Sequence, residues 1–65
     1  MTIYRFTTFN DATTELAGHA DRFTTRAAYY RACRAVWEAA EHSFNGATIS
    51  CTQADDLMSQ FVDAS

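Results

Sequence analysis

The longest regular hydrophobic pattern in this sequence runs from Arg26 to Phe44. Its apolar residues recur at spacings of three and four, with further apolar residues beside them: Tyr30, Cys33, Trp37, Ala40 and Phe44, flanked by Tyr29, Ala32 and Val36. This repeat places the side chains on one face of an α-helix. The apolar sector is about 160° wide, so we expect a central helix packed on two sides. Thr24 or Thr25 would cap its start, and Asn45-Gly46 would end it, with Gly46 left-handed.

Two short segments predict β-strands. Residues 2–8 alternate in polarity and are rich in β-branched and aromatic types, with Tyr4 and Phe6 on one face. This pattern is typical of a half-buried strand. Residues 47–51 are a second expected strand, which would pair with the first.

Two further helices are predicted, one on each side of the central helix in sequence. The first is expected from a cap at Asn10 or Asp11 to about residue 19 or 20, with this apolar face: Phe9, Ala12, Leu16, Ala20 and Phe23. The last would follow a capping box, either Ser50 with Gln53 or Thr52 with Asp55, with this apolar face: Ala54, Leu57, Met58, Phe61 and Val62. The predicted fold is a single α+β domain over residues 1–65, mostly helical. Its order is β-α-α-β-α, with a two-stranded sheet packed on the central helix.

The charge pattern narrows the classes of partner. The chain of 65 residues carries a net charge of -3, and its five cations are all arginine. Nonspecific nucleic-acid binding needs Lys and Arg to neutralise phosphates, so we expect no direct contact with nucleic acid. A basic partner is compatible with this charge. No export signal or apolar run of membrane-spanning length is visible, so we expect a cytoplasmic protein with free thiols that does not bind membranes.

The residues that could carry chemistry do not form a recognisable motif. The four potential zinc ligands His19, Cys33, His42 and Cys51 lack the paired spacing of metal sites, and Cys33 falls on the apolar face of the central helix. Cys51 near a helix start is a conceivable nucleophile with His42 in reach, but no third group or Gly-rich oxyanion loop accompanies it. We therefore predict no metal, no cofactor, no catalytic residue and no enzymatic activity.

Acidic residues are the predicted partner-binding groups. They fall on all three expected helices: Asp55, Asp56 and Asp63 on the last, Glu38 and Glu41 on the central one, and Asp11 and Glu15 on the first. No cation follows Arg34, so the acids of the C-terminal half are expected to lack compensation. For the central helix a second interpretation stays open, in which Arg34–Glu38 and Glu38–His42 pairs form a self-compensating solvated face.

A very short, acidic α+β chain without a catalytic motif resembles the small phage-encoded anti-CRISPR proteins, in particular inhibitors of the type I-C surveillance complex. The resemblance covers the whole chain, from MTIYRFTTF to DLMSQFVDAS, and rests on overall character, so it transfers no functional residue. It implies a monomeric, non-enzymatic inhibitor that binds a CRISPR effector complex in the host bacterial cell stoichiometrically. Binding would block recognition of target DNA.

Two other functions remain open. One is a small phage or plasmid accessory or regulatory protein that binds another host protein through an apolar patch. The other is an antitoxin-like or transcriptional partner that places the row Arg26, Arg31 and Arg34 on nucleic acid, which the absence of lysine disfavours.

Overall fold

The computed structural model describes residues 3–43 and 46–62. Its elements follow in the order β1 (Ile3–Arg5), α1 (Phe9–Glu15), the 3-10 helix η1 (Ala17–Arg22), α2 (Arg26–Glu41), β2 (Thr48–Ser50) and α3 (Cys51–Val62). This order confirms the predicted α+β class with a two-stranded antiparallel sheet. The 3-10 helix η1 is an addition to the prediction.

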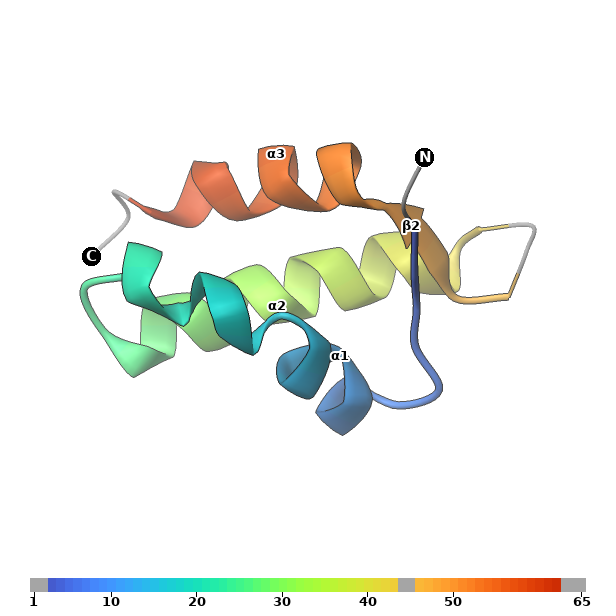
Figure 1. Ribbon diagram of the computed structural model, residues 1–65, viewed down its shortest axis with the longest axis horizontal. Helices are drawn as coiled ribbons and strands as arrows, with labels where there is room; N and C mark the ends of the chain where they lie inside the picture. The colour runs from blue at the N-terminus through green and yellow to red at the C-terminus, as the bar shows by residue number, and fades with distance from the viewer. Residues whose placement is uncertain (1–2, 44–45, 63–65) are drawn as a thin grey trace.

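Helix α2 lies at the centre of the molecule. It packs most extensively against α3, and it also contacts α1 and β2 (Figure 1). The expectation of a central helix packed on more than one side is therefore confirmed. Thr25 begins it as predicted, because its hydroxyl accepts a hydrogen bond from the Ala28 N–H at 3.1 Å. The helix ends at Glu41, before the predicted Phe44, which lies outside the described residues.

The buried face of α2 is rotated from the predicted one. Its buried residues are Ala28, Tyr29, Ala32, Cys33, Val36 and Ala40. Tyr30 is 44% exposed, and Trp37 is only partly buried. The reason is packing distance, since the separation of two helices depends on the side chains at their contact. Small side chains at a helix contact allow a shorter separation, and most of the buried residues of α2 are small, with Tyr29 the one large ring among them.

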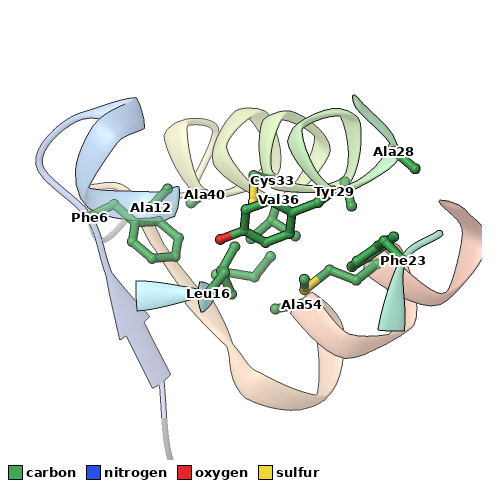
Figure 2. Close-up of a cluster of buried hydrophobic side chains, with 13 residues drawn as sticks. Phe6, Ala12, Leu16, Phe23, Ala28, Tyr29, Cys33, Val36, Ala40 and Ala54 are labelled. Carbon is green, nitrogen blue, oxygen red and sulfur yellow. The ribbon is translucent and has the colours of Figure 1, made fainter. Parts of the chain in front are cut away.

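Tyr29 joins α2 to α1 through the core. Its ring lies among the buried side chains (Figure 2), and its hydroxyl donates a hydrogen bond to the Thr13 carbonyl. That carbonyl lies in the last turn of α1, where backbone oxygens have no partner within the helix. Burial, the largest cause, raises the pKa of Tyr29 above its ordinary value, so the hydroxyl stays protonated and able to donate.

Helix α1 differs from its prediction at both ends. The cap is Thr8 rather than Asn10 or Asp11, because the Thr8 hydroxyl accepts from the Asp11 N–H at 3.1 Å. The α-helix ends at Glu15, and the chain continues to residue 22 as η1. The Thr13 and Thr14 hydroxyls both donate to the Asn10 carbonyl, at 2.8 and 3.0 Å. Such bonds from threonine to an earlier carbonyl, together with its β-branched side chain, weaken a continuing helix.

The sheet pairs the N-terminal strand with the segment that leads into α3. Strands β1 and β2 are antiparallel, with Tyr4 opposite Ile49, and both are shorter than predicted. The Tyr4 and Phe6 rings stack with their centroids 5.7 Å apart, which confirms that they share a face. At the last residue of β2, the Ser50 hydroxyl accepts a hydrogen bond from the Gln53 N–H at 3.1 Å and caps α3. The structure thus selects the first of the two predicted caps.

The connection into β2 uses left-handed backbone. Gly46 has φ +72°, as predicted, but it lies beyond the end of α2 and so does not serve as the residue that ends that helix. Ala47 follows with φ 58°, and its carbonyl accepts from the Phe6 N–H at 3.0 Å. This bond extends the sheet by one pair past β1.

Replacing Tyr29 by phenylalanine should reduce the free energy of unfolding by about 1 kcal/mol, because the partly buried Thr13 carbonyl loses its hydrogen-bond partner. Tyr30→Phe is the matched control, since Tyr30 is exposed and adjacent on the same helix. It should change stability by less than about 0.5 kcal/mol. Urea unfolding followed by circular dichroism measures both variants, and equal stabilities would contradict the role given to the Tyr29 hydroxyl.

Replacing each of the two glycines by alanine should change the stability of the fold in opposite directions. No neighbouring atom lies within 4 Å of an added Cβ at either site, so only the backbone conformation separates them. Gly46→Ala should destabilise by more than about 1 kcal/mol, whereas Gly18→Ala should stabilise by about 0.4–1 kcal/mol. Thermal melts of both variants test this, and a loss of stability in Gly18→Ala would show that η1 needs glycine there.

Candidate functional site

The described acids of the predicted set lie on three different helices. Glu38 and Glu41 lie on α2, Asp55 and Asp56 on α3, and Asp11 and Glu15 on α1, whereas Asp63 lies outside the described residues. Asp11 has a local role, because its carboxylate accepts from the Thr7 N–H at 3.0 Å and from the Thr7 hydroxyl at 3.3 Å.

The expectation that Asp55 lacks a cationic partner is wrong. The Arg22 guanidinium, on η1, forms an ion pair with the Asp55 carboxylate. The same guanidinium donates to the Ser59 hydroxyl at 2.8 Å, and that hydroxyl donates to the Asp55 carbonyl at 2.9 Å. Arg22 thereby ties η1 to the outer side of α3. The sequence could not reveal this pair, because its members lie 33 positions apart.

A chain of polar groups continues from Arg22 toward the sheet. Arg22 lies 3.5 Å from His19 Nδ1, and the Tyr4 hydroxyl lies 3.5 Å from His19 Nε2. Burial, followed by the neighbouring Cys51, raises the pKa of Tyr4, and the Glu15 and Asp55 charges add to this. The polar groups thus link β1, η1 and α3. Within residues 3–43 and 46–62, no three His, Cys, Asp or Glu side chains are grouped as metal ligands would be.

The cysteines lie in different environments. Cys33 is fully buried in the core, as its place on the apolar face of the central helix predicted, and both cysteines are free thiols. Burial, the largest cause, raises the pKa of the Cys33 thiol above its ordinary value. Cys51 is half-buried at the first position of α3.

The outward side of α2 forms a different kind of surface. Four residues of α2 line a shallow hollow of about 290 Å³, and their spacing is i, i+3, i+4 and i+7: Arg34, Trp37, Glu38 and Glu41. Phe9 of α1 also lines this hollow. We call this feature the α2 hollow. Phe9 is 38% exposed, although its spacing had suggested the buried face of α1. The Trp37 ring contacts the buried Phe6 ring at a centroid distance of 6.3 Å, which anchors its inner side.

The α2 hollow combines aromatic walls with a net negative charge. Arg34 Nε–H donates to the Glu38 carboxylate at 3.3 Å, and this confirms one of the two pairs expected on α2. The expected Glu38–His42 pair does not form, and Glu41 has no ion pair within the described parts of the chain. Two carboxylates beside one guanidinium leave one negative charge. Such a surface suits a partner group that is both apolar and cationic.

A second hollow, of about 440 Å³, lies where η1 meets the start of α2. Phe23, Tyr29 and Tyr30 contribute its aromatic part, and Arg26 its charge. None of the described residues that line it is acidic, so it provides a comparison surface of similar aromatic character and opposite charge.

The apolar spacings of the sequence did not reveal the α2 hollow, because they placed Phe9 and Trp37 in the core. A signal was nevertheless present. Trp37 stands three residues after Arg34 and four before Glu41, which places it beside the charged stripe on a helix. The contribution of Phe9 could not be read in this way, since it comes from a different helix.

The Arg22–Asp55 pair predicts unequal effects of two neighbouring substitutions. Asp55→Asn should reduce the free energy of unfolding by about 0.5–1 kcal/mol, the upper range for a partly exposed ion pair. Asp56→Asn, which changes the net charge equally at an exposed neighbouring position, should have less effect. Urea unfolding at low and high salt compares them, and an equal response of the two variants would show that the pair adds no stability.

Comparisons with known proteins provide no relative from which a function can be transferred. No family model matches the chain, and neither a curated protein nor a solved structure does. Among the described residues, none of the helices is long and apolar enough to cross a membrane. The resemblance to anti-CRISPR proteins therefore stays a prediction, and any function assigned to this chain depends on its own surface residues.

Proposed function

We propose that this chain is a non-enzymatic inhibitor that binds a CRISPR effector complex stoichiometrically and blocks recognition of target DNA. The α2 hollow is the observation that supports this best. Exposed aromatic residues are enriched in protein interfaces, and tryptophan is among the residues that contribute most binding energy. Phe9 and Trp37 lie here beside exposed carboxylates, so apolar contact and charge are available on one surface.

The charge of the chain fits the proposed target. A complex that holds nucleic acid does so with a positively charged channel. A protein of net charge -3 is attracted to such a surface, and charges at the edge of an interface mainly speed association. Binding near the channel would exclude DNA by occupying space and by neutralising the field that attracts phosphates.

The acidic residues contribute unequally to this proposal. Glu41 and Glu38 border the α2 hollow and would contact the partner directly. The other predicted acids would contribute long-range attraction, and Asp55 would contribute less because Arg22 pairs with it: Asp11, Glu15, Asp55 and Asp56, together with Asp63.

The proposal is tested with a purified type I-C effector complex and labelled target DNA. Addition of the wild-type chain should abolish DNA binding, measured by fluorescence anisotropy, at a stoichiometric ratio to the complex. Phe9→Ala should weaken inhibition at least about tenfold, equivalent to about 1.4 kcal/mol, as expected for an aromatic residue at the centre of an interface. Tyr30→Ala, an exposed aromatic in the comparison hollow, should leave inhibition unchanged.

Circular dichroism melts establish that both variants are folded. If the wild-type chain at micromolar concentration neither binds the complex nor displaces DNA, the proposal is wrong. Capture of a different host protein by the wild-type chain, lost in Phe9→Ala, would then favour the accessory-protein alternative.

A further inference from the structure

We propose that the α2 hollow receives a single arginine side chain of the partner, which lies against Trp37 and pairs with Glu41. This inference rests on the proposed function and names the chemistry of the contact. The hollow volume of about 290 Å³ is at the small end of ligand-binding sites, which suits one inserted side chain better than a helix or an extended segment.

The walls of the hollow match an arginine in shape and polarity. The Trp37 ring contacts the ring of Phe6, which is 2% exposed, so the core supports Trp37 from its inner side. Phe9 supplies a second aromatic wall from α1. Guanidinium groups stack on aromatic rings and are less strongly hydrated than ammonium groups, so arginine loses less on entering such a site than lysine does.

The charges of the hollow leave one position for a cation. Arg34 of this chain already places a guanidinium beside Glu38, at 3.3 Å, which shows that such a group is accommodated among these side chains. Glu41 lies one turn along α2 from Glu38, on the same hollow, and has no ion pair in the described part of the chain. A second guanidinium at Glu41 would bring the local charge from one negative to zero.

The other acidic groups do not offer the same combination. Asp55 is already paired with Arg22, and Asp11 is bonded to Thr7. Neither of these two carboxylates lines the α2 hollow, with its aromatic walls. The inserted arginine is therefore assigned to Glu41 rather than to the acidic surface in general.

Trp37 allows a direct test, because it is the only tryptophan in the chain and it lines the hollow. The probes are a short blocked peptide, acetyl-Gly-Arg-Gly-amide, and its citrulline counterpart, which has nearly the same shape without the charge. The arginine peptide should change Trp37 emission saturably, with a dissociation constant on the order of millimolar for one side chain. The citrulline peptide should bind at least about fivefold more weakly, and raised salt should weaken the arginine peptide alone.

Two variants with the same change of net charge locate the contact. Glu41→Gln should weaken the arginine peptide at least about fivefold, whereas Asp56→Asn, outside the hollow, should leave its dissociation constant within about twofold. Both positions are exposed, and melts confirm folding. Equal binding of the arginine and citrulline peptides, or equal weakening by the two variants, would overturn the inference.

The effector assay separates this inference from the proposed function. Loss of inhibition in Glu41→Gln, with inhibition intact in Asp56→Asn, supports the arginine contact. Inhibition of DNA binding that Glu41→Gln leaves unchanged overturns the contact but retains the proposed function. If the chain prefers the arginine peptide but never affects the effector complex, the arginine site is retained and the proposed function is wrong.

Discussion

The close packing of α2 against its neighbours is the constraint on which the rest of this structure depends. A chain of this length buries only about 60% of the surface that it exposes when unfolded, so its contacts must be close and continuous. The small residues Ala28, Ala32 and Ala40 meet this requirement, because they let the neighbouring helices approach. Tyr29 then fills the remaining space and satisfies a carbonyl at the end of α1, so one side chain serves both packing and hydrogen bonding.

The same constraint creates the candidate site. Of the three rings of α2, Tyr29 is buried, whereas Tyr30 is exposed and Trp37 is only partly buried, with its ring against that of Phe6. Phe9 reaches the same place because α1 packs on α2. The α2 hollow is therefore formed by the packing of α1 on α2. The same packing places the rings of Phe9 and Trp37 beside Glu38 and Glu41.

Charge is distributed by the fold in a way that composition does not show. Arg22 joins η1 to α3 through Asp55, and Arg34 partly compensates Glu38 on its own helix. The acids of this chain, whose net charge is -3, therefore fall into two groups. Some have a cationic partner within the fold, and others, such as Glu41, have no ion pair in the described residues. Only the second group is available to a partner without first breaking an internal pair.

The sequence by itself determined where the main helices lie, that two short strands pair, and that Thr25 and Ser50 are among the candidate caps, because these features depend on local periodicity and on hydrogen bonds between near neighbours. It also placed six of the predicted acids on the correct helices: Asp11, Glu15, Glu38, Glu41, Asp55 and Asp56. Only the tertiary structure decided which side of α2 faces inward, since apolar spacings of three and four are compatible with more than one buried face. Tertiary contact likewise brought Phe9 to Trp37 and Arg22 to Asp55, because the distance between residues of different elements depends on how those elements pack and leaves no periodic trace in the sequence.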